Sequence, residues 1–433
     1  MTAQRERMVV SLQLFLLSIA SFWLPTSSFV HIGLQRSFRR YFAASLSSTD
    51  SKTQQIEFEL HPSISDISAE SWDACLDESS SPFLEHAWLR CLEESKCASP
   101  ETGWVPQHVS IKINGEIRGY VPLYLKGHSM GEFIFDNAWA ETAYDNNINY
   151  YPKLLAGIPF TPATGQRILL HPDLNFTRQQ VADLRRTVGE FLKQVALNNN
   201  ISSVHLNFVT DEEATDLSGA LPHEEEDSLA RRTVKTMLKK LAYKDTYLRR
   251  TSLQYHWTNS NVNNDGKPYE SFDDYLGCFK SKRRITIRRE REKVQHDEGI
   301  RVEAIAGKDI LKYEGLVERM FEIYVSTVDK LYWGRQYLTL EFFQLVCKSD
   351  FVKNLCFMVA RCKSTSEELR ADHVFAGTFN IVKNGVFYGR YWGCLPGRQV
   401  KNLHFETCYW SAVDYCIQNG LKRMEPGAGG GGT

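Results

Sequence analysis

The folded body of this sequence lacks the glycine-rich loops that hold nucleotide phosphates. The pattern G-x-x-x-x-G-K-[ST] occurs nowhere, and G-x-G-x-x-G does not occur between residues 53 and 428, so ATP or dinucleotide chemistry is not expected. The ten cysteines include no C-x-x-C pair, which argues against a metal site and favours reduced, partly buried thiols. A formal net charge of −1 excludes a strong overall attraction to nucleic acid or membranes. No permanently bound cofactor is therefore expected.

What the chain does contain is enough apolar material for two domains. It has 433 residues, of which 42% are hydrophobic and 24% charged. This composition is typical of folded globular proteins, and the length exceeds what one hydrophobic core usually supports. We expect a targeting segment at 1–52, a first lobe at 53–210, a charged connector at 211–267 and a second lobe at 268–433.

The first 52 residues have the composition of a targeting segment. Arg5 and Arg7 precede a mostly apolar run from Met8 to Leu24, and no acidic residue lies between Glu6 and Asp50. A signal peptide followed by a basic, serine-rich transit segment predicts import into a plastid, with the mitochondrion or the secretory route as alternatives. The apolar run is marginal for a bilayer span of roughly 20 residues, so no stable membrane anchor is expected after processing.

Hydrophobic periodicity predicts similar elements in both halves of the body. Strands at 109–113 and 117–123 flank Asn114-Gly115, and strands at 375–382 and 386–392 flank Asn384-Gly385. Asn-Gly between alternating strands predicts a type I′ hairpin in each half. A helix and then a strand follow each hairpin, at 177–195 and 204–208 in the first half and at 403–418 and 421–425 in the second. The fold class expected is α+β, with mixed sheets flanked by helices.

The densest charge lies between Lys280 and Lys293, on a predicted helix. Arginine forks pair well with phosphate oxygens, so this helix is a candidate clamp for the phosphates of a donor. A solvated helix with internal ion pairs has about equal weight from charge alone. The candidate phosphate-binding residues are Arg284, Arg288 and Arg289, together with Arg390 from the predicted strand at 386–392.

Proton transfer has two candidates at the start of the helix predicted at 403–418. Glu406 and His404 could accept a proton from an attacking amine, although pairing of Glu406 with the helix N-terminus is the simpler interpretation. A substrate pocket is expected where aromatic and polar side chains gather. Its candidate residues are Asp136, Trp139, Tyr151, Lys153, Thr161, Thr164, Arg167, Tyr391 and Trp392.

Several strings along the chain resemble one known family, the FemAB-like proteins of the acyl-CoA N-acyltransferase (GNAT-like) superfamily. They include Gly103-Trp104-Val105-Pro106-Gln107-His108, Tyr150-Tyr151-Pro152-Lys153-Leu154, Pro159-Phe160-Thr161-Pro162-Ala163-Thr164-Gly165, Lys282-Arg283-Arg284 and His404-Phe405-Glu406. The resemblance implies two GNAT-like lobes and transfer of an acyl or aminoacyl group to an amine. The donor it implies is acyl-CoA, another small thioester or aminoacyl-tRNA, and the amine acceptor is open.

The C-terminal end departs from the family pattern. After Glu425-Pro426-Gly427-Ala428 the chain ends in Gly429 to Thr433, where the family continues with a further segment. The resemblance therefore predicts that the second lobe is truncated. It also keeps a second function open, a noncatalytic GNAT-like module that binds RNA or a protein partner through the basic helix at 280–293.

Overall fold

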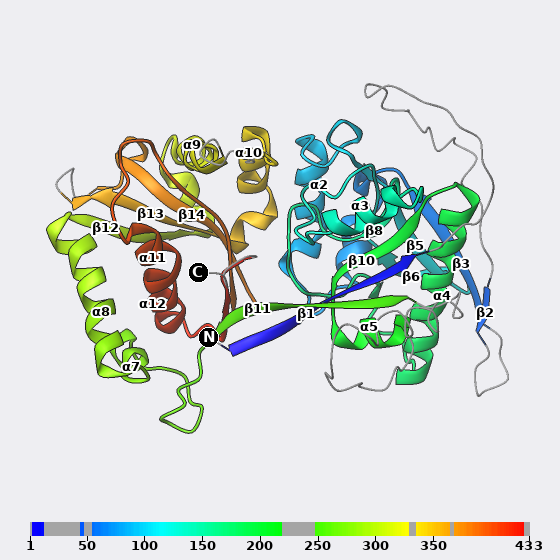
Figure 1. Cartoon of the computed structure of the whole chain (residues 1–433), viewed down its shortest axis with the longest axis horizontal. Helices are drawn as coiled ribbons and strands as arrows, with labels where there is room; N and C mark the ends of the chain where they lie inside the picture. The colour runs from blue at the N-terminus through cyan, green and yellow to red at the C-terminus, as the bar shows by residue number, and fades with distance from the viewer. Residues whose placement is uncertain are drawn as a thin grey trace. The chain divides into compact units, whose positions relative to one another are not determined.

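The computed structural model describes residues 2–12, 44–46, 54–218, 247–328, 335–363 and 368–427. The chain divides into two compact units, drawn in Figure 1. We call Glu6–Ser80 with Ala98–Ser252 the N-terminal lobe, and Met1–Arg5, Ser81–Cys97 and Leu253–Thr433 the C-terminal lobe. Each lobe contains a mixed sheet flanked by helices, which confirms the predicted α+β class.

The N-terminal lobe contains two sets of paired strands. In the first, β3 (Gln54–His61), β5 (His108–Ile113), β6 (Glu116–Val121) and β9 (Leu169–Leu170) run antiparallel, with β2 (Ala44–Leu46) beside β3. Asn114 and Gly115 between β5 and β6 have φ values of 52° and 86°. Positive φ at both central residues is the type I′ geometry, so the first predicted hairpin is confirmed.

The second set of strands in this lobe is mixed in direction. Strand β10 (Ser203–Val209) pairs parallel with β8 (Lys153–Ala156) and antiparallel with β1 (Thr2–Leu12), and β8 continues to β7 (Leu123–Lys126) and β4 (Trp104–Pro106). Short helices α1 (Ala69–Asp73) and α3 (Asn137–Asp145) connect strands.

Helix α4 (Arg178–Asn198) closes the core of the N-terminal lobe. It begins at Thr177, whose hydroxyl and the Gln180 side chain form a capping box, the arrangement that satisfies free N–H groups at a helix start. Its apolar stripe packs on the strands, and the rings of Phe191 and Phe58 stack with centroids 4.3 Å apart.

In the C-terminal lobe four antiparallel strands precede one parallel strand. The order is β12 (Ile300–Ala306), β13 (Leu355–Cys362), β14 (Val374–Lys383) and β15 (Val386–Cys394), after which β16 (Arg423–Glu425) pairs parallel with β15 and antiparallel with β11 (Leu248–Thr258). Asn384 and Gly385 have φ values of 52° and 78°, which confirms the second predicted hairpin.

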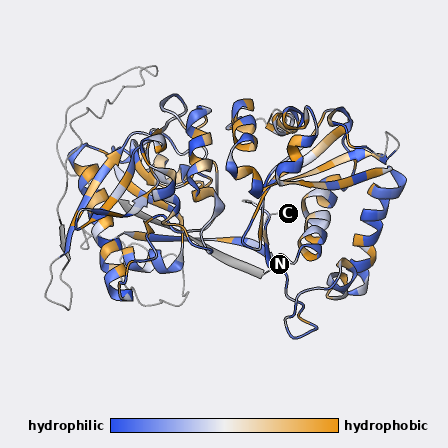
Figure 2. Ribbon diagram, turned by 180° about the vertical axis from the view of Figure 1, so that it is seen from behind, coloured by the Kyte–Doolittle hydropathy of each residue, from blue (hydrophilic) through white to orange (hydrophobic). Residues whose placement is uncertain are grey.

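The helix predicted at 403–418 consists of α11 (Leu403–Phe405), a π-helical turn η10 (Glu406–Trp410) and α12 (Ser411–Gln418). Helices α7 (Phe272–Gly277) and α8 (Ser281–Glu292) precede β12, and a second π-helical turn, η5 (Lys293–Asp297), extends α8. Helices α9 (Leu316–Val328) and α10 (Leu340–Lys348) complete the lobe. Figure 2 shows α8 as mostly hydrophilic, whereas β13 and β14 carry more hydrophobic residues.

Two segments differ from the domain boundaries that were predicted from the sequence. Ser81–Cys97, within the expected first lobe, belongs to the C-terminal lobe. There the Trp88 ring of α2 (His86–Glu94) lies 5.2 Å from the Phe342 ring, and Glu85 accepts a hydrogen bond from Asn354 and pairs with Lys383. Contacts with residues far away in the sequence therefore place this segment in the C-terminal lobe.

The acidic start of the expected connector is also structured. It forms α5 (Asp211–Ser218), and the fully buried Glu213 accepts hydrogen bonds from the backbone N–H groups of Arg167 and Ile168. The interpretation of this stretch as an exposed connector is wrong, because its carboxylates satisfy buried donors. Residues 219–246 of the connector and 13–43 of the expected address lie outside the described residues. Within the described ranges, no helix is long and apolar enough to cross a bilayer.

Candidate functional site

Three neighbouring strands of the C-terminal lobe carry polar side chains on one face of their sheet. Trp257, Phe387 and Met424 belong to the apolar core, one each on β11, β15 and β16. Side chains alternate between the two faces of a strand, so residues one or three positions from these three along each strand point away from that core. We call this set the polar sheet face. It consists of Gln254, His256, Tyr388, Arg390, Arg423 and Glu425.

Strand pairing brings the members of the polar sheet face together. Tyr388 lies opposite Glu425 in the β15–β16 ladder. Arg390 lies in a β-bulge opposite β14, because Phe379 pairs with Tyr391 and the next residue, Asn380, pairs with Gly389. A bulge of this kind re-aims a side chain and is frequent beside active sites. The Arg390 guanidinium lies 4.3 Å from the ring centroid of Phe83 and 5.7 Å from that of Tyr388.

Glu425 is the acidic group of the polar sheet face. Its side chain is 2% exposed, and Oε1 lies 2.7 Å from Nη2 of Arg423. Its other oxygen, Oε2, is buried and has no hydrogen-bond partner among the described residues. Burial raises the pKa of Glu425, and the charges of Arg423 and Arg390 oppose that effect. A carboxylate with one uncommitted oxygen and a raised pKa is suited to accept a proton.

His256 and Tyr388, two further members of this face, are neutral at physiological pH. Burial, with the charges of Arg423 and Arg390, lowers the pKa of His256 to about 4. Burial, with the nearby Glu425 carboxylate, raises the pKa of Tyr388 to about 12. Two guanidinium groups and one carboxyl group therefore set the charge of the face, beside a hydroxyl and an imidazole that can exchange hydrogen bonds.

Glu406, a predicted catalytic residue, lies in a different part of the same lobe. Its side chain is 1% exposed, and Oε1 accepts hydrogen bonds from Arg291 (3.2 Å), Gln295 (2.8 Å) and Ser411 (2.9 Å). The carboxylate thus holds three donors in place. Arg291 also pairs with Asp414 at 3.4 Å and lies 4.2 Å from the ring centroid of Phe272.

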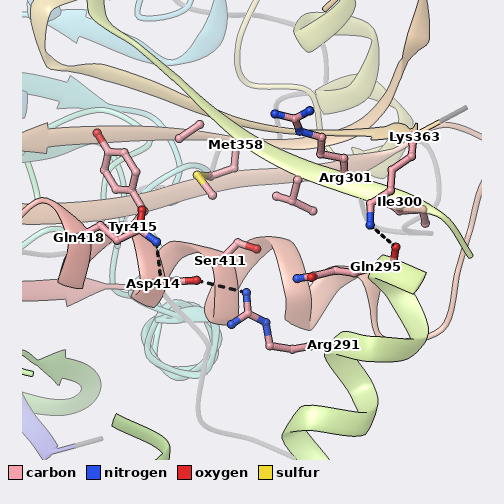
Figure 3. A pocket seen from close by; sticks show the side chains of 12 residues that line it. Arg291, Gln295, Ile300, Arg301, Met358, Lys363, Ser411, Asp414, Tyr415 and Gln418 are labelled. Atoms are coloured by element: carbon pink, nitrogen blue, oxygen red, sulfur yellow. Dashed lines mark hydrogen bonds and ion pairs between the residues drawn. The ribbon is translucent and has the colours of Figure 1, made fainter. Parts of the chain in front are cut away.

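The three partners of Glu406 line a pocket of about 320 Å³, which we call the β12 pocket. Figure 3 shows Arg291, Gln295, Ser411 and Asp414 on one side of it and Met358 and Ile300 on the other. Its apolar wall consists of Ile300, Val302, Ala304 and Met358, and its polar wall of Arg291, Gln295, Arg301, Lys363, Ser411, Asp414, Tyr415 and Gln418. Glu406 itself is not among the lining residues.

His404, the other predicted catalytic residue, lies on the surface. Its ring contacts those of Trp392, Phe405 and Tyr409, and burial lowers its pKa. Within the described part of the chain, no hydrogen bond joins His404 to Glu406. The pairing of the two residues in proton transfer is therefore not the arrangement observed.

The predicted phosphate-binding arginines of α8 do not converge. Arg284 donates to the Phe279 carbonyl at 3.0 Å, Arg288 pairs with Asp273 at 2.9 Å, and Arg289 is exposed. Arg291, one turn further along, is the arginine of this helix that lines the β12 pocket. Of the four arginines predicted, only Arg390 joins the polar sheet face.

In the N-terminal lobe, three predicted pocket residues meet around Ser129. Its Oγ lies 2.6 Å from Lys153 Nζ, 2.7 Å from Asp136 Oδ2 and 2.8 Å from the Tyr151 hydroxyl. Lys153 also pairs with Glu132 at 3.0 Å and with Asp136 at 2.9 Å. Gly127 to Gly131 reads G-x-S-x-G, but no helix follows Ser129 directly, so the segment is not a nucleophile elbow.

A second lysine completes this group. Lys126 is fully buried, its Nζ lies 3.5 Å from the ring centroid of Trp104, and burial lowers its pKa to about 7, against the opposing charge of Glu132. We call Lys126, Glu132, Asp136 and Lys153 the lysine cluster. Its four ionisable groups are buried, which is typical of a structural ion network.

The remaining predicted pocket residues are spread over both lobes. Trp139 is exposed on α3, Thr161 donates to the Pro159 carbonyl, and the buried Arg167 donates to the carbonyls of Ala163 and Gln166. Thr164 lies in the same loop. Tyr391 contacts Tyr324 and Trp392 contacts His404, both in the C-terminal lobe. The described structure therefore does not unite the predicted pocket within one lobe.

Comparison with known proteins identifies the family. A model of the FemAB-like family, described as peptidoglycan biosynthesis/recognition, matches residues 63–432. The chain belongs to the FemAB-like family. No curated protein matches it at the level required for a relative.

Solved structures similar to this FemAB-like chain include two proteins. The first, described as FemX, has 12% identity and a TM-score of 0.40, and the match covers 83% of this chain and 86% of that one. The second is a tandem GNAT protein from the clavulanic acid biosynthesis pathway, with 10% identity, a TM-score of 0.32, and coverage of 85% and 88%.

Proposed function

We propose that this FemAB-like protein transfers an acyl or aminoacyl group from an activated donor to a primary amine, and that the polar sheet face carries the chemistry. The donor is a thioester or an aminoacyl-tRNA. The family description, peptidoglycan biosynthesis/recognition, favours an amine on a peptidoglycan-related acceptor. The observation that carries the proposal is the buried Glu425, whose Oε2 has no partner among the described residues.

The reaction needs a proton acceptor, because an amine is an ammonium ion at neutral pH. Glu425 takes that proton, and the free amine attacks the acyl carbonyl carbon. A C–N bond forms, and the C–S or C–O bond to the donor breaks. The raised pKa of Glu425 makes it a stronger base than an exposed glutamate.

The neighbours of Glu425 suit the other demands of acyl transfer. Arg423 holds one carboxylate oxygen at 2.7 Å, which orients the other. Arg390, re-aimed by the bulge and seated on the Phe83 ring, offers positive charge to a developing oxyanion or to a donor phosphate. The neutral Tyr388 hydroxyl can donate a proton to the leaving group and take in its place the second proton that the attacking nitrogen loses when the amide forms.

Glu425 replaces Glu406 as the base in this proposal. Oε2 of Glu406 is buried without a hydrogen-bond partner among the described residues, as is Oε2 of Glu425. The two carboxylates differ at Oε1, which in Glu406 accepts three hydrogen bonds from groups that line the β12 pocket and in Glu425 pairs with Arg423. Glu406 is therefore suited to position Arg291 and Gln295 rather than to meet an amine.

The test is acyl transfer by Glu425→Gln, measured by mass spectrometry of amine products with acyl-CoA and aminoacyl-tRNA donors. Glutamine keeps the shape and cannot take the proton, so the rate should fall by about 10²–10⁴-fold. Glu341→Gln, an exposed carboxylate of α10, is the control and should keep the rate within a few-fold. An equal rate in Glu425→Gln and the parent protein would contradict the assignment. Absence of transfer, together with salt-sensitive RNA binding lost in Arg289→Ala, would favour the noncatalytic alternative.

A further inference from the structure

The β12 pocket is built by an unusual backbone feature. Among the described residues only two segments are π-helical, η5 (Lys293–Asp297) and η10 (Glu406–Trp410). Gln295 of η5 lines this pocket and donates a hydrogen bond at 2.8 Å to Glu406 of η10, which holds the lining residues Arg291 and Ser411 from behind. π-Helical turns are rare and are frequently found at functional sites. Two that meet through one hydrogen bond indicate a site rather than a packing defect.

The charged wall of the pocket is preorganised. Arg291 is fixed by Glu406, by Asp414 and by the Phe272 ring, so little side-chain entropy remains to be lost when a ligand binds. Lys363 is different, because its Nζ donates to the Gln295 carbonyl at 2.7 Å. Among the described residues, no carboxylate lies within ion-pair distance of Lys363. Its charge is therefore available to an anion.

The apolar wall of the β12 pocket determines which ligand body fits beside the charged head group. Ile300, Val302 and Ala304 alternate along β12 and face the helices together with Met358 of β13. A volume of about 320 Å³ lies at the lower end of the range for small-molecule sites. An apolar wall facing a lysine suits a short hydrocarbon body with an anionic head.

We propose that the β12 pocket binds a small organic anion, with a carboxylate or phosphate monoester head near Lys363 and an apolar body against Val302, Ala304 and Met358. This site is distinct from the polar sheet face and does not rest on the transfer reaction. Its ligand is recognised by charge and by chain length together.

The test is calorimetric titration of the full chain with three probes of equal chain length, hexanoate, hexyl phosphate and hexylammonium. Both anions should bind, the tighter one identifying the head group, and hexylammonium should not. Lys363→Met should weaken anion binding roughly tenfold. The matched control is Lys348→Met, which removes an exposed lysine of α10 and should leave binding unchanged.

A second variant separates the apolar wall from the charge. Ala304→Leu narrows the pocket and should weaken hexanoate and hexyl phosphate while leaving the circular dichroism spectrum unchanged. Equal binding of all three probes, no binding of either anion, or unchanged affinity in Lys363→Met would each overturn the proposal.

Discussion

The lysine cluster and the polar sheet face are both groups of buried charges, but their cations differ in access to solvent. Lys126 and Lys153 are fully buried, and Lys153 lies between two carboxylates. In the polar sheet face the carboxylate is buried, whereas Arg423 is 35% exposed at its side chain. A cation that reaches solvent can meet a ligand, and one sealed in an ion network stabilises its surroundings. The comparison assigns structure to the first group and chemistry to the second.

The sharpest way to break this comparison is to remove Lys153. Lys153→Met leaves Glu132 and Asp136 buried without their shared partner, and loss of one partner from a buried pair costs about 3–5 kcal/mol. Hydrogen exchange of the β8 and β10 amides should report this loss within the N-terminal lobe. Arg423→Met should cost less in its own lobe, because Arg423 is 35% exposed and Arg390 remains near the Glu425 carboxylate. Equal losses would show that the two groups have the same role.

Local sequence patterns were sufficient for most of the elements. Asn-Gly between alternating strands located both hairpins, and apolar periodicity located α4, α12 and their following strands. These patterns involve residues within a few positions of each other, so the elements can be predicted from the sequence alone. The assignment of Ser81–Cys97 to the C-terminal lobe depends on contacts such as Trp88 with Phe342, and no local pattern encodes them.

Only part of the candidate site could be predicted from the sequence. Arg390 was found from its strand, but Glu425 was not, because β16 has only three residues and shows its alternation only beside its neighbours. The signal existed in His256-Trp257 and in Arg423-Met424-Glu425, where apolar residues alternate with ionisable ones. Gln295 and Arg291 depend on π-helical turns, which residue periodicity at 3.6 per turn does not predict.

A second contrast concerns pH, through Lys126. Its folded pKa of about 7 lies below the unfolded value of about 10.4. Between these pH values the unfolded chain binds one more proton, so this contribution to stability is full above the unfolded pKa and is lost as pH falls through the folded pKa. The free energy of unfolding of the parent protein should rise from pH 7 to pH 9 relative to Lys126→Met, by up to ~1.4 kcal/mol per pH unit.

Lys312→Met is the control for this measurement, because Lys312 is an exposed lysine paired with Asp309. Its stability should follow that of the parent protein across the same pH range. A flat difference between parent and Lys126→Met would mean that Lys126 keeps its proton and that the cluster is a fully charged network.

The smallest effect is expected for Arg390, and it tests how this guanidinium is held in the polar sheet face. Arg390→Lys keeps the charge but replaces a flat guanidinium, 4.3 Å from the Phe83 ring centroid, with a compact ammonium that stacks less well. The stability of the C-terminal lobe should fall by about 0.5–1 kcal/mol, and the same change in a Phe83→Leu background should cost less, because the ring is already gone. Transfer activity separates two roles for the residue. If Arg390 meets the donor as well as the ring, Arg390→Lys raises KM more than the stability loss explains. If Arg390 contacts only the Phe83 ring, the folded variant keeps the kcat and KM of the parent protein. The contact to the oxyanion or phosphate must then come from Arg423.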